Sequence, residues 1–121
     1  MVITITVREL FDFVDEVRPN AYSDRIKTVW LNEAEGLVST EVYHLPKDKI
    51  KIYDAEINPS EKLSVDEPHS KLYYAYILAM IDFTNGEFAR YENSSALFNA
   101  FYLEFVRYYS MKNYTGGLED E

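Results

Sequence analysis

The chain has 121 residues, which is enough for one domain with a sizeable core that needs no disulfide or metal support. It contains no cysteine, which excludes a disulfide framework, a thiolate zinc site and a cysteine nucleophile, and which fits a reducing cytoplasm. Twenty-one acidic and twelve basic residues give a formal net charge of -9, and the basic residues form no tight cluster. Specific binding to nucleic acid or to an anionic membrane is therefore not expected.

The N-terminal part of the chain predicts a short helix. Thr6 and Glu9 form the T-x-x-E pattern of a capping box, and apolar residues then recur at helical spacing up to Pro19. We expect this helix over residues 7–17. The β-branched residues before it, 2–5, predict a short extended stretch, and this apolar run is too short for a signal peptide or a membrane span.

A second helix is predicted over residues 23–44, with Ser23 as its N-cap and Pro46 beyond its end. Its apolar positions share one face: Ile26, Trp30, Ala34, Leu37, Val38 and Val42. The next twenty or so residues are charged and carry two prolines. The alternation of Ile50, Ile52 and Tyr53 predicts at most one short strand or hairpin in this long loop.

Two further helices are predicted in the second half of the chain. Residues 69–84 are strongly apolar, predict a centrally placed helix, and are followed by the stop signal Asn85-Gly86. Residues 87–112 predict a helix with a broad aromatic face that calls for two neighbours. The diglycine and acidic residues of 114–121 predict a flexible tail. The chain is thus expected to form a single, mostly α four-helix domain over residues 1–121.

No motif for catalysis, metal binding or cofactor binding is present. The chain lacks a Gly-rich phosphate loop, a G-x-S-x-G elbow and an H-E-x-x-H pair, so we expect no enzyme activity and no cofactor. Glu41 and His44 have the Glu-x-x-His spacing of di-iron bundles, but the second copy that such a site requires is missing. His44 is expected to lie by the last carbonyls of its helix, and His69 to be a solvated first-turn residue.

Two stretches of the sequence resemble a known family. The first is 7–16 (VRELFDFVDE) leading to 30–33 (WLNE), and the second is 80–94 (MIDFTNGEFARYENS) followed by 96–99 (ALFN). Together they are similar to the head-tail connector (adaptor, or head completion) proteins of tailed bacteriophages and prophages of Gram-positive hosts. The resemblance extends from the first predicted helix through the fourth.

The resemblance implies a structural virion protein rather than an enzyme. It implies a helical subunit that joins a ring of roughly twelve copies on the phage portal protein and contacts the next head-completion or tail protein. The expected location is then the head-tail junction of the virion, or the host cytoplasm during assembly. An acidic surface fits this role, because a conduit wall that repels DNA lets the genome slide.

A ring subunit needs two different lateral surfaces and an element that docks on the portal. The candidate interface residues lie in two regions, the tail and the charged loop. They are Tyr108, Tyr109, Met111 and Tyr114, and Ile50, Ile52 and Tyr53. The alternative for the tail tyrosines is that they cover the end of the helical bundle.

Two other functions fit parts of the sequence. A small acidic regulator or inhibitor that occupies a basic site by charge mimicry is compatible with the net charge of -9. An enzyme built on carboxylates is supported by no motif. The connector and the regulator are distinguished by whether the chain binds a portal or a basic enzyme.

Overall fold

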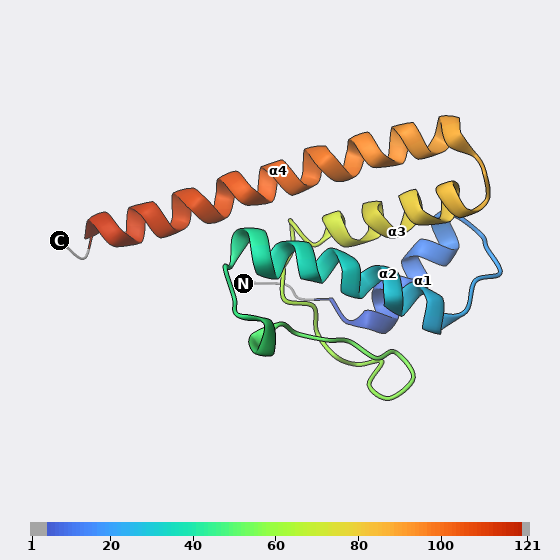
Figure 1. Ribbon diagram of the computed structural model, residues 1–121, viewed down its shortest axis with the longest axis horizontal. Coiled ribbons are helices and arrows are strands. Elements are labelled where there is room, and N and C mark those ends of the chain that lie inside the picture. The colour runs from blue at the N-terminus through green and yellow to red at the C-terminus, as the bar shows by residue number, and fades with distance from the viewer. Residues whose placement is uncertain (1–4, 120–121) are drawn as a thin grey trace.

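The computed structural model describes the backbone over residues 5–119 and the side chains as far as Asn113. It contains four α-helices, and no strand occurs within the described residues (Figure 1). The helices are α1 (Val7–Val17), α2 (Asp24–Leu37), α3 (Lys71–Thr84) and α4 (Phe88–Glu119). The predicted fold class, a mostly α domain of four helices with a long loop between the second and the third, is confirmed.

Helix α1 has the predicted bounds, and the capping box forms. The Glu9 amide donates to Thr6 Oγ1 at 3.1 Å, and the Thr6 amide donates to Glu9 Oε1 at 2.9 Å. The helix buries Leu10, Phe11 and Val14. Of the extended stretch predicted before it, residues 2–4 lie outside the described part of the chain, and Ile5 is not in a strand.

Helix α2 begins after Ser23, whose hydroxyl accepts a hydrogen bond from the Ile26 amide at 3.3 Å. It then widens into one π-helical turn, Val38–Val42, which the apolar periodicity does not predict. The helical segment ends at Val42 with Tyr43 as its C-cap, and the backbone of the following residue, His44, is left-handed with a φ of 55°. His44 therefore lies directly after the helical end, as predicted.

Helix α3 lies at the centre of the fold, in contact with α1, α2 and α4, as predicted. It begins at Lys71 rather than at residue 69, because the amides of His69 and Ser70 both donate to the Asp66 carbonyl and form a separate turn. It ends where predicted. Gly86 has a φ of 75°, a conformation that glycine adopts without strain, and its amide donates to the Phe83 carbonyl.

Helix α4 runs back antiparallel over α3 and continues to Glu119, well beyond the predicted end at residue 112 (Figure 1). The structure thus assigns residues 114–119, where the sequence predicts a flexible tail, to α4, and the last two residues lie outside the described part of the chain. Ser94 and Phe105 are the only buried residues among the α4 side chains that the structure describes. Most of this helix is thus open to solvent.

The loop between α2 and α3 is packed against the core rather than extended into solvent. Tyr53, Ala55, Leu63 and Val65 are buried. Its regular structure is one 3-10 turn, Lys47–Lys49, and one isolated antiparallel bridge that joins Thr6 to Lys62. The predicted strand at Ile50–Tyr53 does not form. Part of the loop instead pairs with the start of α1: the amides of Val7 and Arg8 donate to the carbonyls of Glu61 and Pro59, both at 2.9 Å.

Two polar side chains of α2 hold this loop. The Asn32 amide group exchanges two hydrogen bonds with the backbone of Tyr53, at 2.8 and 3.0 Å. Glu35, which is 1% exposed, accepts hydrogen bonds from four hydroxyl groups. The donors and their distances are Tyr73 at 2.6 Å, Ser64 at 2.7 Å, and Ser39 and Tyr53 at 3.2 Å each. Because burial of a carboxyl group is unfavourable without such partners, this cluster fixes the loop in one position.

A second buried acid joins three helices. Asp82 of α3 is 1% exposed, forms an ion pair with Arg18 at the end of α1, and accepts a hydrogen bond from Ser94 of α4 at 2.6 Å. The start of α4 is therefore tied to both α1 and α3. The C-terminal half of α4 has no comparable anchor within the described residues.

Candidate protein interface

The C-terminal part of α4 extends past the end of the helical body (Figure 1). Among the described α4 side chains, the last one that packs against the core is Tyr109. Beyond it, Met111 is 68% exposed. A helix that leaves its domain with apolar side chains uncovered is typical of a surface that binds another protein.

Aromatic side chains from three elements meet where α4 leaves the body. The His69 ring, at the start of α3, lies 4.5 Å from the Tyr108 ring and 5.7 Å from the Phe105 ring. Tyr43, after the π-helical turn, lies 5.2 Å from Tyr109 and 6.2 Å from Phe105 in tilted and edge-on arrangements. Such aromatic pairs contribute more stabilisation than their buried apolar area alone would give. The five rings therefore stabilise the position of α4 at the point where it leaves the body.

A groove of about 200 Å³ runs between this aromatic cluster and the segment 64–68. Charged groups lie at its edge: the Lys112 ammonium is 5.9 Å from the centre of the Tyr108 ring, and Glu104 Oε1 is 3.6 Å from His69 Nδ1. That nitrogen is buried and has no hydrogen-bond partner among the described residues. The groove thus combines aromatic walls with charged groups nearby, which suits a peptide or side chain of a partner.

The hydroxyl group of Tyr43 joins the cluster to the loop between α2 and α3. It donates to the Ser64 carbonyl at 3.5 Å, and burial, the main cause, raises its pKa above the ordinary value for tyrosine. The hydroxyl therefore stays protonated over the physiological pH range. Its role in the cluster is to pack and to donate a hydrogen bond, not to exchange a proton.

The predicted tail residues differ in their surroundings. Tyr108 is 47% exposed and Met111 is 68% exposed, so both are available to a partner. Tyr109 is half-buried against Tyr43 and Phe105 and helps to cover the end of the bundle, the alternative that the sequence left open. The Tyr114 side chain lies outside the described part of the structure.

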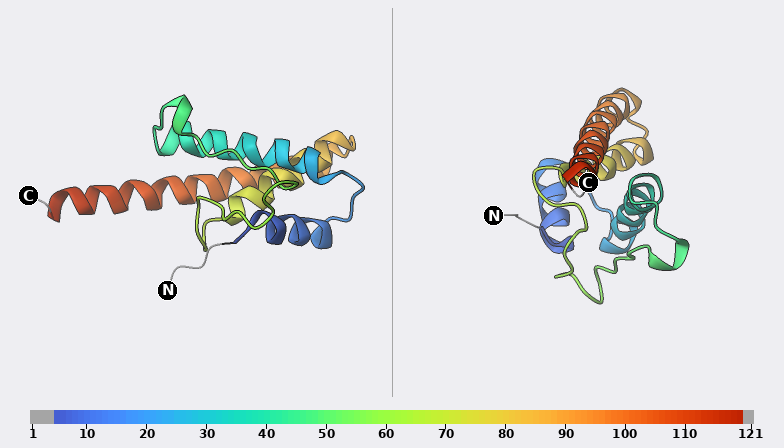
Figure 2. Two further views of the ribbon diagram at one scale, coloured as in Figure 1. Left: turned by 90° about the horizontal axis from the view of Figure 1, so that it is seen from below. Right: turned by 90° about the vertical axis from the view of Figure 1, so that its left-hand side faces the viewer.

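The predicted loop residues do not join the tail residues in one surface. The part of the loop around the 3-10 turn, Lys47–Lys49, lies on the far side of the helical body from α4 (Figures 1 and 2). Ile52 is 69% exposed and Ile50 is partly buried, so both remain candidates. The prediction of Tyr53 as an interface residue is wrong, because its side chain is buried in the core and donates to Glu35.

Sequence reasoning missed two residues of the aromatic cluster, Tyr43 and His69. His69 was expected to be a solvated first-turn residue, but it is only 12% exposed at its side chain, because α4 passes over it. Helical periodicity cannot place a residue that lies just outside a helix. The single available signal was the Pro68-His69 pair at a helix start, which does not indicate contact with another element.

The acidic groups do not assemble into a metal site. Glu41 accepts a hydrogen bond from the Tyr102 hydroxyl at 2.5 Å, while His44 is exposed at the helical end. Among the described side chains, which end at Asn113, no group of three or more histidine, cysteine or acidic residues is arranged to hold a metal ion. Among the same residues, no helix combines the length and the hydrophobicity needed to cross a membrane.

Comparisons of the chain with protein-family models, with curated proteins and with solved structures find no match.

Proposed function

We propose that this chain is a structural phage protein, a head-tail connector that assembles as a ring on the portal and helps to join the capsid to the tail. The proposal rests on the resemblance of residues 7–16 and 30–33, and of residues 80–94 and 96–99, to that family, and one structural observation supports it. Beyond Tyr109, α4 leaves the body of the protein, and none of its described side chains there packs against the core. Its proposed location is the head-tail junction of the virion, or the host cytoplasm during assembly.

The part of α4 beyond Tyr109, with its neighbour Tyr108, is expected to gain stability by binding another protein. An isolated helix is marginally stable in water, since most helical stability in proteins comes from packing of an apolar face. Gly116 and Gly117 lower the helix propensity of its last turns further. Contact with a partner would bury Tyr108 and Met111 and hold these turns in place, so this half of α4 is the proposed docking element for the portal.

The charge of the chain fits the same role. A net charge of -9 on a ring subunit disfavours contact with DNA, which must pass through a connector without sticking. The other proposed partner is the head-completion or tail protein that follows in the assembly. A regulator that binds a basic enzyme by charge mimicry is the competing interpretation, and the following experiment separates the two.

The test is a pull-down of the purified chain with the portal protein encoded beside it in the same genome. The full chain should bind, and a chain truncated after Ser110 should not. The truncation removes no residue of the described core, whose last member is Tyr109, so a circular dichroism spectrum should show the truncated domain still folded.

Two single variants on α4 sharpen the result. Met111→Glu places a charge on the projecting half and should weaken portal binding at least about tenfold. Leu103→Glu makes the same change at a residue of similar exposure in the half of α4 that lies beside α3, and should leave binding within about twofold of the unmodified chain. Absence of binding by the folded full chain would contradict the proposal and favour the regulator.

A further inference from the structure

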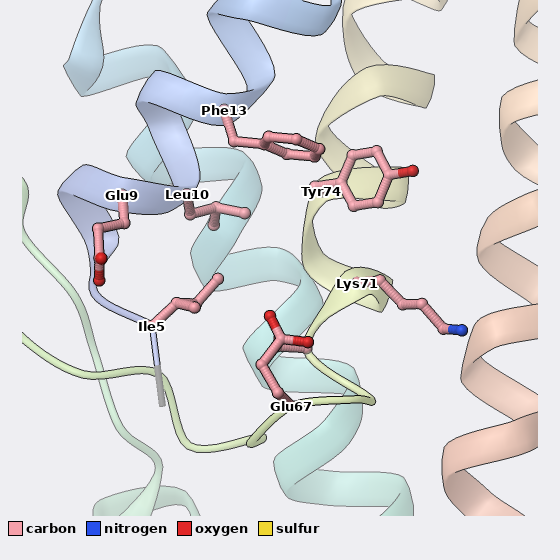
Figure 3. A pocket seen from close by; sticks show the side chains of 8 residues that line it. Ile5, Glu9, Leu10, Phe13, Glu67, Lys71 and Tyr74 are labelled. Carbon is pink, nitrogen blue, oxygen red and sulfur yellow. The ribbon is translucent and has the colours of Figure 1, made fainter. Parts of the chain in front are cut away.

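A second cleft lies on the face formed by α1 and the start of α3 (Figure 3), and Glu67 lines both this cleft and the groove beside the aromatic cluster. Its volume is about 370 Å³, near the lower end of the range for ligand pockets. Its walls are largely apolar and consist of Ile5, Leu10, Phe13 and Tyr74, with Phe13 and Tyr74 in edge-to-face contact at 5.1 Å. An aliphatic chain is the kind of group that these walls would cover.

Two polar groups of the cleft are unused. Ser70 is fully buried and lines the cleft, and its hydroxyl has no hydrogen-bond partner among the described residues. The Glu67 carboxyl group points into the cleft, and no cation among the described residues pairs with it (Figure 3). A buried hydroxyl and a carboxylate that both lack partners indicate a ligand with a hydrogen-bond donor and positive charge.

The nearest cation does not fill this role. The Lys71 side chain is directed toward α4, away from the cleft centre, and its ammonium lies 3.6 Å from Glu104 Oε1 and 4.6 Å from the centre of the Phe101 ring (Figure 3). Glu9, at the other edge, adds a second acidic group, which is bonded to the Thr6 amide. The cleft is thus apolar within and acidic at its mouth, which matches a lysine side chain with its aliphatic stem and charged end.

The most basic stretch of this chain is exposed on the opposite side of the molecule. The segment 45–52 contains Lys47, Lys49 and Lys51 against one acidic residue, and ends at the exposed Ile52. Lys51 pairs with Glu61, whereas Lys47 and Lys49 have no ion-pair partner among the described residues. Figure 2 shows α1 on one side of the body and the 3-10 turn of this segment on the other, in both of its views.

We propose that the cleft binds the segment 45–52 of a second copy of this chain, with Lys47 or Lys49 placed against Glu67 and Ser70. This inference rests on the proposed function, because it names the lateral contact of the ring. A contact between two different surfaces on opposite sides of a subunit is head-to-tail, and its repetition closes a ring when the rotation between neighbours permits. The opposite charges of the two surfaces would also fix the direction of assembly.

Cross-linking of cysteine variants tests this contact directly, since the chain has no cysteine of its own. Glu67→Cys and Lys49→Cys are purified separately, mixed, and treated with a short bismaleimide, alone and with the portal protein present. Each variant has a cysteine on only one of the two surfaces. A cross-linked dimer should therefore form in the mixture and should not form when either variant is treated alone. Glu92→Cys, on an exposed part of α4, replaces Glu67→Cys in the control mixture and should give no such product.

Charge reversal provides an independent measurement. Glu67→Lys should weaken self-association at least about tenfold in sedimentation velocity, and a mixture of Glu67→Lys with Lys47→Glu/Lys49→Glu chains should recover it. The proposal is overturned if the chain self-associates without the mixed cross-link, if it stays monomeric both alone and on the portal, or if Glu67→Cys cross-links to the portal instead. If the chain binds the portal but the mixed cross-link does not form, this contact is rejected and the proposed function is retained. If the mixed cross-link forms but the chain does not bind the portal, only the proposed function is rejected.

Discussion

Replacement of Tyr73 with phenylalanine removes one hydroxyl group from the buried cluster around Glu35. That hydroxyl donates to Glu35 Oε1 at 2.6 Å, accepts from the Val65 amide at 3.2 Å, and lies 3.1 Å from the Ser64 hydroxyl. Burial, the largest cause, and the nearby Glu35 raise the pKa of Tyr73 well above its ordinary value, so the hydroxyl is a permanent donor. The ring itself stays in place in the variant.

The expected loss of stability follows from these contacts. A hydrogen bond to a charged group contributes about 1.5–3 kcal/mol, and a buried amide left without a partner is unfavourable by about 1–3 kcal/mol. These terms overlap because the loop can relax, so we expect Tyr73→Phe to lower the free energy of unfolding by about 2–3 kcal/mol. Urea unfolding followed by circular dichroism gives this value directly.

Tyr76→Phe is the matched control. It deletes the same atom one turn further along α3, where the hydroxyl donates to Glu33 Oε1 at 2.9 Å in an exposed position. The control should change stability by less than about 1 kcal/mol, because water replaces the lost partner. The reasoning fails if both variants have the same effect, or if Tyr73→Phe stays within about 0.5 kcal/mol of the unmodified chain.

Three further predictions use the same assay. The free energy of unfolding should fall above about pH 10, by up to about 1.4 kcal/mol per pH unit for each tyrosine with a raised pKa. The reason is that these tyrosines keep their protons in the folded state and release them in the unfolded state. Because Tyr73 is one of them, Tyr73→Phe should make the free energy of unfolding fall less steeply with pH. Asp82→Ala should destabilise by about 2–4 kcal/mol, because it leaves the partly buried Arg18 guanidinium and the buried Ser94 hydroxyl without their acceptor. Glu87→Ala, at an exposed ion pair, should change stability by less than about 0.5 kcal/mol. Thr6→Ala should cost about 1 kcal/mol, because it removes the N-cap hydrogen bond of α1. Flat stability up to about pH 11, equal effects of the two acidic substitutions, or a neutral Thr6→Ala would each contradict the corresponding argument.

The helices could be predicted from the sequence because local signals determine them. The capping box at Thr6 and Glu9, the apolar periodicity, and the Asn85-Gly86 stop placed α1 and the end of α3 correctly. The predicted end of α4, residue 112, is too early. The prediction used the two glycines near the end of the chain as a helix-stop signal, but the helix continues through them to Glu119. The π-helical turn, Val38–Val42, has no sequence signature of this kind.

The packing of the loop could not be predicted, because long-range polar contacts hold it. Nothing local distinguishes Glu35 from a surface glutamate, yet it binds four hydroxyl groups from three parts of the chain. Tyr53 was assigned to an interface for the same reason: a tyrosine in a charged loop has no periodicity that indicates burial. Tyr108 and Met111, in contrast, were recognised as apolar area beyond what one packed face requires, and both are exposed.

The central claim, that this chain is a connector built on a portal, is tested most directly by counting its copies on the purified portal assembly with native mass spectrometry. The connector account predicts a stable complex that holds one copy of the chain for each portal subunit, and that is lost when the chain is truncated after Ser110. A portal that carries no bound chain, or only a few copies in variable number, would contradict it.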